Sequence, residues 1–383
     1  MPNFRHVIGD AYAEILLRRP DPAGLESFQR AMEQGLTREG LREALLRSPE
    51  YASRFTDEVP PADMSLRVEG NQFVDPRGGR VRLVGAIVCC EESKQNGWPL
   101  VNLDVLDLFA ARGLNYTHCR LGPFTVAGEA DPSYVGYLTA ADGRVDLERF
   151  NASFWDRCRA IAARASERRI YVEFDLIDRW IRQHGATDLP QVDPWSARNN
   201  VQGLEAGGLR IFERAPTPLH ERWLRKAVAE LGGFDAVLFQ VGNEGFKSFS
   251  SAWELGVRDV VKDELRRRGF HDRLVGTNTH DASLEAELDY VARHAQEAQP
   301  AGTQPILVNE YSTLPSDDVL QQVRRAERFG TMFMYWRGDH PRPVWERTLG
   351  ELERAVAAPA TSFASKSGTR KRARLKSGMR GRT

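Results

Sequence analysis

The sequence has no long hydrophobic run, and this absence limits how the chain can meet a membrane. No apolar stretch among its 383 residues approaches the length of about 18 residues that a bilayer span requires. Residues 1–19 carry charges too closely spaced for the apolar centre of a signal peptide. We therefore expect no membrane span and no classical secretion, which places the chain in the cytoplasm or, alternatively, on a leaderless export route.

An excess of charge of either sign is also absent. Lys plus Arg and Asp plus Glu each number 53, so the overall balance favours neither nucleic acid nor an anionic membrane as a partner. The predicted folded part has no basic groove with interleaved aromatic residues, and nucleic-acid binding is therefore not expected. With 41% hydrophobic and 28% charged residues, the chain can bury a large core.

Cysteine is scarce, and its spacing does not indicate a cysteine-based site. Cys89, Cys90, Cys119 and Cys158 show no metal-ligand spacing, and two adjacent cysteines make a poor disulfide framework. The first three lie in apolar runs typical of strands. We expect all four to be small core residues, and the sequence predicts neither a metal nor a cofactor.

Residues 1–57 are predicted to form a small all-α domain. The pair Asp21-Pro22 is typical of a helix start, and apolar residues recur at helical spacing on either side of it. The motifs LLRRPDPAGL and LLRSPEY resemble a short repeat of unknown function, related to phycobilisome linker segments, in bacterial surface and polysaccharide-associated proteins. The resemblance implies adhesion or anchoring, and a helical cap that stabilises its neighbour is the alternative. Residues 58–65, with two prolines, are the predicted linker.

From residue 66 to residue 358, short apolar runs alternate with amphipathic segments. The expected strands are residues 81–89, 114–121, 170–177, 236–241, 274–278, 288–292, 306–309 and 331–336. The expected helices are residues 101–112, 149–168, 219–231, 252–267, 317–328 and 344–357, with a short one near residue 284. Eight strands in about 275 residues are typical of a (β/α)8 TIM barrel, an α/β fold. A doubly wound sheet is the fallback, but no glycine-rich phosphate loop follows the first strand.

Two segments differ from this alternation. Residues 178–218 are too long for an ordinary connection and carry Trp180 and Trp195, so we expect a lid or substrate wall there, with a mobile insertion as the alternative. Residues 359–383 contain eight basic side chains and no acidic one. This composition predicts a disordered basic tail, which either contacts an anionic polymer or is simply solvated.

Two glutamates end apolar strands that are far apart in the sequence. Glu244 follows the apolar run 237–241, and Glu310 follows the run 306–308. In a barrel these would be the fourth and seventh strands, whose ends lie at the same face. Glycoside hydrolysis requires two such groups, because one carboxylic acid protonates the leaving oxygen while a carboxylate about 5 Å away attacks the anomeric carbon in retaining enzymes.

The surrounding motifs resemble those of a known family. Over residues 66–357, FQVGNE, LVNEY and NYTHCRLGPF are similar to the acid/base, nucleophile and second-strand motifs of cellulase-type glycoside hydrolases of clan A. The resemblance implies that Glu244 is the general acid/base and that Glu310 is the nucleophile. It also implies that Asn243 donates to the sugar hydroxyl beside the anomeric carbon. Arg120 would lie next to Glu310, where its charge would keep the nucleophile ionised.

Further substrate contacts follow from the same resemblance. Trp336 would form an aromatic floor for the sugar ring, and His294 would approach from the sixth strand. The third strand, YVEFDLID, lacks the final histidine of many relatives, and residues 295–296 include no tyrosine where relatives have one. Tyr311 or Tyr335 is a candidate for the missing phenol. These departures mean that the substrate class does not follow from the family.

Together these features predict a retaining glycoside hydrolase that cleaves β-glycosidic bonds of a polysaccharide or oligosaccharide with two glutamates. The alternative is a catalytically silent barrel that binds carbohydrate as a surface or matrix protein.

Overall fold

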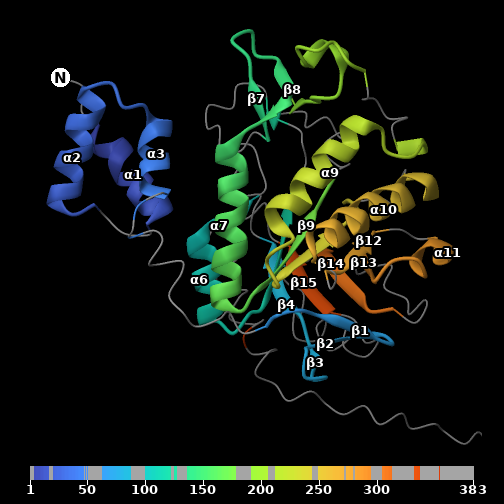
Figure 1. Cartoon of the computed structure of the whole chain (residues 1–383). Helices are drawn as coiled ribbons and strands as arrows, with labels where there is room; N and C mark the ends of the chain where they lie inside the picture. The colour runs from blue at the N-terminus through green and yellow to red at the C-terminus, as the bar shows by residue number, and fades with distance from the viewer. Residues whose placement is uncertain are drawn as a thin grey trace, which may run out of the picture. The chain divides into compact units, whose positions relative to one another are not determined.

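The computed structural model describes residues 4–16, 20–46, 48, 50, 63–87, 100–121, 125–126, 136–177, 191–205, 212–243, 249–270, 273–278, 281–294, 304–312, 332–336 and 353. The chain divides into two compact units, Met1–Met64 and Ser65–Thr383 (Figure 1). Most of the predicted linker and the whole predicted basic tail lie outside the described residues, as do the predicted helices at 317–328 and 344–357 except for residue 353.

In the first unit the described elements are three helices, α1 (Arg5–Ile15), α2 (Pro22–Glu33) and α3 (Arg38–Leu46). Asp21 begins α2 as predicted, because its carboxylate accepts a hydrogen bond of 2.8 Å from the backbone N–H of Gly24 and Pro22 occupies the first helical position. The apolar face of each helix turns inward. The resulting core consists of Ile8, Ala11, Tyr12, Ile15, Leu16, Met32, Leu41 and Leu45.

The second unit contains a closed barrel of eight strands. In chain order they are β4 (Val84–Ile87), β5 (Tyr116–Arg120), β9 (Tyr171–Asp175), β11 (Val237–Gln240), β12 (Val275–Thr277), β13 (Tyr290–His294), β14 (Ile306–Ser312) and β15 (Met332–Trp336). Each strand pairs in parallel with the next along the chain, and β15 pairs with β4. The predicted (β/α)8 barrel is confirmed, and the closure excludes the open doubly wound sheet.

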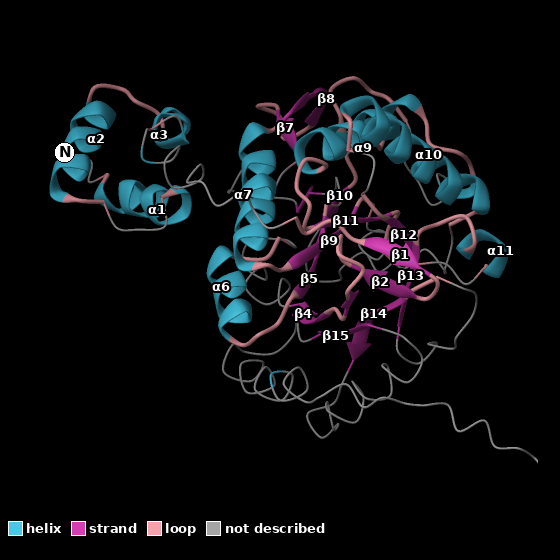
Figure 2. Cartoon of the chain, turned by 60° about the horizontal axis from the view of Figure 1, so that its bottom comes forward, coloured by secondary structure: helices cyan, strands magenta, loops and turns pink. Residues whose placement is uncertain are grey.

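The described helices lie outside the ring of barrel strands (Figure 2). They are α6 (Leu103–Ala111), α7 (Ala152–Arg168), α9 (Pro218–Leu231), α10 (Ser251–Arg268) and the short α11 (Ala282–Glu285). Among the described side chains, β4, β5, β9, β11 and β12 each direct one face into a core shared with helices, because alternate strand residues point to opposite sides. The core between strands and helices includes Phe109, Cys119, Cys158, Ile161, Val172, Phe174, Trp223, Val237, Phe239 and Val261. Cys119 and Cys158 are buried free thiols, as expected, whereas Cys89 and Cys90 lie outside the described residues.

Two predicted boundaries are wrong because the side chain of an asparagine binds the backbone there. The strand expected over residues 81–89 is divided into β3 (Arg80–Val81) and β4. The side chain of Asn115 interrupts it, since its amide donates to the carbonyl of Arg82 and its oxygen accepts from the N–H of Val84, both at 2.8 Å. The helix expected from residue 149 begins only at residue 152, because Asn151 caps it by accepting a 3.1 Å hydrogen bond from the N–H of Ser153.

Several short strands surround the barrel. The strands on either side of the turn at residues 75–79, β2 (Gln72–Val74) and β3, form an antiparallel sheet with β1 (Arg67–Glu69). The hairpin of β7 (Tyr137–Thr139) and β8 (Val145–Phe150) was not predicted from the sequence. Neither was the pairing of β6 (Thr125–Val126) with β10 (Gln191–Val192), which joins the long insertion to the segment after β5. Within the described residues, no helix has the length and apolarity to cross a membrane.

Candidate active site

The carboxyl-terminal end of the barrel is built by neighbouring strands in register. Arg120, the last residue of β5, is the partner of Asp175 at the end of β9, and Asp175 is the partner of Gln240 at the end of β11. All three side chains are buried, and Arg120 retains only 4% of its exposure. A guanidinium, a carboxylate and an amide therefore stand side by side at the end of the barrel where functional groups of this fold gather.

The turn after β11 carries the predicted sugar ligand Asn243. Its backbone N–H donates a 2.9 Å hydrogen bond to the carbonyl of Ile177, just beyond β9, and its side chain is 1% exposed. Gly242 is required for this approach, because a Cβ at that position would lie 2.5 Å from the Ile177 carbonyl oxygen and 2.7 Å from the Phe249 ring. The next residue, Glu244, lies outside the described residues, as does Trp180.

The seventh strand brings Glu310 to the same end of the barrel. The backbone of Glu310 in β14 is the partner of His294 at the end of β13. The register shifts near this point in both pairings of β14, between Arg293 and His294 where it pairs with β13 and between Val308 and Tyr311 where it pairs with β15. The side chains of His294, Glu310, Tyr311 and Trp336 lie outside the described part of the chain. The convergence of Glu244 and Glu310 therefore stays a prediction.

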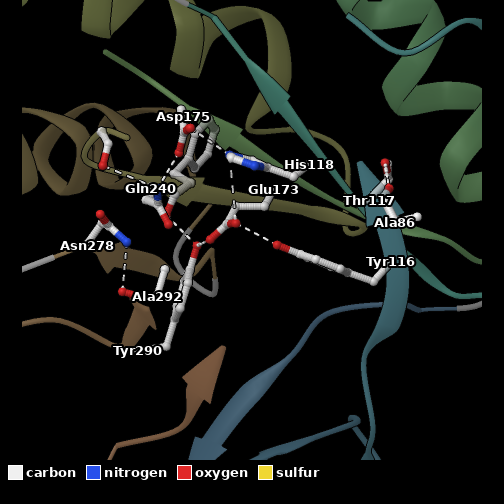
Figure 3. A network of polar contacts seen from close by, with 12 residues as sticks. Ala86, Tyr116, Thr117, His118, Glu173, Asp175, Gln240, Asn278, Tyr290 and Ala292 are labelled. Carbon is white, nitrogen blue, oxygen red and sulfur yellow. Dashed lines mark hydrogen bonds and ion pairs between the residues drawn. The ribbon is translucent and has the colours of Figure 1, made fainter. Parts of the chain in front are cut away.

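Below this end, the barrel encloses a buried carboxylate held by two phenols. Glu173 of β9 is fully buried and accepts hydrogen bonds from Tyr116 on one oxygen, at 2.5 Å, and from Tyr290 on the other, at 2.7 Å (Figure 3). Tyr290 also contacts the carbonyl oxygen of Phe239 at 2.9 Å. The ring of Tyr290 passes over Gly276, where a Cβ would lie 2.3 Å from two ring atoms, so this glycine makes room for it.

A second set of buried polar side chains, formed by His118, Asp175 and Gln240, lies next to Glu173 and its two phenols. The Nε2 atom of His118 is 2.6 Å from one oxygen of Asp175, and the other oxygen of Asp175 accepts from the side-chain amide of Gln240. The same amide donates to the carbonyl of Gly242 at 3.2 Å. His118 also lies 4.0 Å from Glu173, which links the two groups (Figure 3). The barrel interior is thus polar where an aliphatic layer is usual.

Burial controls the ionisation of this network. It raises the pKa of Glu173, and the repulsion of Asp175 adds to the increase, whereas His118 and the two phenol donors act in the opposite direction. The pKa of Tyr116 and that of Tyr290 are both raised well above the ordinary value, chiefly by burial and then by the charge of Glu173. The two phenols therefore remain protonated hydrogen-bond donors. Within the described residues, no group of three or more His, Cys, Asp and Glu side chains could hold a metal ion.

Trp195, predicted to line a substrate wall, occupies a different environment. Its side chain is fully buried, its Nε1 atom donates to the hydroxyl of Tyr137 at 3.4 Å, and its ring meets the edge of His220 at a centroid distance of 4.5 Å. It belongs to the same core as α7 and α9. In the described structure Trp195 therefore anchors the insertion to the barrel, and the wall that we expected does not include its ring surface.

No protein-family model matches the sequence. No curated protein matches it either. Among solved structures, a β-mannanase from the blue mussel Mytilus edulis is similar at 12% identity and a TM-score of 0.46, over 76% of this chain and 97% of that one. A β-1,4-D-mannanase from Cryptopygus antarcticus is similar at 11% identity and a TM-score of 0.47, over 76% of this chain and 94% of that one. An exo-β-1,4-mannosidase from an Opitutaceae bacterium is similar at 14% identity and a TM-score of 0.47, over 75% of this chain and 60% of that one. The barrel assignment depends on the strand pairing of this chain, not on these similarities.

Five residues of the buried network were not predicted from the sequence to be functional: His118, Glu173, Asp175, Gln240 and Tyr290. One signal was present for His118, Glu173 and Asp175, since polar residues occupy every second position of YTHCR and YVEFD, two strands that are buried throughout. In a barrel strand such alternate positions face the interior. The pattern indicates a polar interior, but it does not show which side chains meet.

Proposed function

We propose that the chain is a retaining glycoside hydrolase that acts on a β-linked polysaccharide or oligosaccharide. One observation carries the proposal: β11 and β14 are the fourth and seventh strands of a closed parallel barrel. The segments that lead to Glu244 and contain Glu310 therefore end at the same rim. Asn243 and Arg120, which the family resemblance implies lie beside the two glutamates, belong to that rim at the ends of β11 and β5, the two strands that flank β9.

The proposed reaction has two displacements. The carboxylate of Glu310 attacks the anomeric carbon while Glu244 gives its proton to the departing glycosidic oxygen, and a covalent glycosyl ester forms. Water then attacks the same carbon, Glu244 takes the proton from that water, and the ester bond to Glu310 breaks. Arg120 would hold Glu310 in its ionised form, and Asn243 would bind the hydroxyl beside the reacting carbon. We place His294, Tyr311 and Trp336 around the sugar.

The test is covalent trapping. A 2-deoxy-2-fluoro glycoside with an activated leaving group should form an adduct on Glu310 that mass spectrometry of the digested protein can locate. Glu310→Gln should form no adduct, and Glu244→Gln should lower the turnover of a natural glycan by about 10²–10⁴-fold, the usual contribution of acid–base catalysis. Glu69→Gln is the matched control, because Glu69 is an exposed residue of β1, outside the barrel strands. Its carboxylate forms a surface ion pair with the guanidinium of Arg67 at 3.9 Å.

Two results would contradict the proposal. One is a parent protein that neither hydrolyses nor is labelled across a broad panel of glycans and fluoroglycosides. The other is unchanged turnover of a confirmed substrate in both active-site variants. If the parent binds a glycan without cleaving it, the carbohydrate-binding barrel becomes the better account.

A further inference from the structure

A line of buried polar side chains connects the second barrel strand to the turn after the fourth. It runs from His118 of β5 to Asp175 of β9, over 2.6 Å, and then to the side-chain amide of Gln240 in β11. The amide nitrogen of Gln240 also donates to the carbonyl of Gly242, at 3.2 Å, in the turn itself (Figure 3). The three side chains are at most 1% exposed.

These contacts fix the orientation of Gln240. A primary amide has two N–H groups, and here one is directed to Asp175 and the other to Gly242. Asp175 carries only acceptor oxygens when ionised, so it selects the nitrogen of Gln240 rather than its oxygen. Hydrogen bonds in such a water-excluded setting are electrostatically stronger than they would be in water, and an unmet partner is costly.

The turn is held from a second side as well. The N–H of Asn243 donates to the carbonyl of Ile177 at 2.9 Å, and the carbonyl of Gln240 accepts a 2.9 Å bond from the N–H of Leu176. Gly242 leaves the space that this approach of the two segments requires. The peptide before Asn243 is therefore clamped between the end of β9 and the side chain of Gln240.

We propose that Gln240, oriented by Asp175 and His118, is a positioning residue for the turn at residues 242–243 and, through that turn, for Glu244. This inference rests on the proposed function, in which Glu244 is the acid/base. Gln240 would not touch the substrate. Its effect is to hold the backbone from which Glu244 extends, and a misplacement of about 1 Å in such a group can lower the rate by about 10²-fold.

Hydrogen exchange tests the positioning without any assay of activity. Gln240→Glu removes both donors and sets a carboxylate against Asp175, so the Gly242 carbonyl loses its partner. Amide exchange in peptides that cover residues 237–249 should become about tenfold faster, as expected for the loss of one hydrogen bond that restrains the turn. Gln240→Met removes the donors at similar volume without adding a charge, and it should give the same faster exchange. It replaces Gln240→Glu in the experiment if the carboxylate of that variant prevents folding. Gln72→Glu in β2 is the matched control. Unchanged exchange at residues 237–249 in the Gln240 variants would overturn the proposal.

Kinetics then distinguish a positioning role from a general loss of structure. Cleavage of a glycoside with a poor leaving group needs the proton of Glu244, whereas dinitrophenolate leaves a dinitrophenyl glycoside without being protonated. The Gln240 variants should lower kcat/KM by about 10²-fold for the first substrate and leave bond cleavage in the second largely unchanged. Equal losses on both substrates would also overturn the proposal. An inactive, unlabelled parent would instead refute the hydrolase assignment, and the exchange experiment would still decide the role of Gln240.

Discussion

Replacement of Tyr290 by Phe would remove one oxygen atom from the centre of the barrel. That hydroxyl lies 2.7 Å from Glu173 and 2.9 Å from the carbonyl oxygen of Phe239, and the whole side chain is buried. At a pH where Glu173 is ionised, a hydrogen bond to this charged group contributes about 1.5–3 kcal/mol, and a buried acceptor left without its donor costs about as much. We therefore expect Tyr290→Phe to lower the free energy of unfolding by about 2–3 kcal/mol, a large part of the roughly 5–15 kcal/mol that is typical of a folded protein.

Urea unfolding followed by tryptophan fluorescence measures this loss, and Tyr137→Phe provides the control. Tyr137 is also buried, but among the described residues its hydroxyl accepts a long bond of 3.4 Å from Trp195, and neither group is charged. Its removal should cost about 0.5–1 kcal/mol, the lower part of the range for neutral hydrogen bonds. If Tyr290→Phe were no more destabilising than Tyr137→Phe, then the contact with Glu173 would not stabilise the barrel as reasoned.

Two further predictions concern the same network. Burial raises the pKa of Glu173 above its ordinary value of 4.5, so the folded state retains a proton that the unfolded state releases. The stabilisation of the folded state by this proton is complete below pH 4.5 and is lost as the pH rises through the raised pKa. Glu173→Gln, which cannot ionise, should show a shallower fall of unfolding free energy with increasing pH than the parent, and parallel curves from urea titrations would contradict this. Gly276→Ala should cost about 3 kcal/mol, because its Cβ would lie 2.3 Å from the Tyr290 ring. In a Tyr290→Ala background the same change should cost much less, and a double-mutant cycle that showed additive losses would exclude the clash as the cause.

The barrel could be predicted from the sequence because each of its strands is a short apolar run bounded by turn residues. The run 237–241, for example, contains four apolar residues around Gln240, and its strand is buried on both faces. The alternation of such runs with amphipathic segments leaves few arrangements other than a parallel barrel. The same regularity predicted which strands lead to Glu244 and Glu310, since that required only their order along the chain.

The interior of the barrel could not be predicted in the same way. Whether Tyr290 meets Glu173 depends on the stagger of β13 against β9, two strands that do not pair with each other, and on the space that Gly276 leaves. The local boundaries failed for a similar reason. Asn115 ends one strand from more than thirty positions away in the sequence, at separations of 31 and 33 residues from its two partners. Contacts of this kind follow from register, which a single sequence does not display.

The buried polar contacts of β9 connect it to three other barrel strands, β5, β11 and β13. Glu173 holds Tyr116 of β5 and Tyr290 of β13, while Asp175 holds His118 of β5 and Gln240 of β11. A change at either carboxylate therefore acts on neighbouring strands together, and through Gln240 it reaches the turn that precedes Glu244. Aliphatic side chains in the same positions could fill the volume equally well, but they would not fix the orientation of an amide or a phenol. A polar interior can lower stability and still be retained, because the end of the barrel above it has to hold its groups in one arrangement.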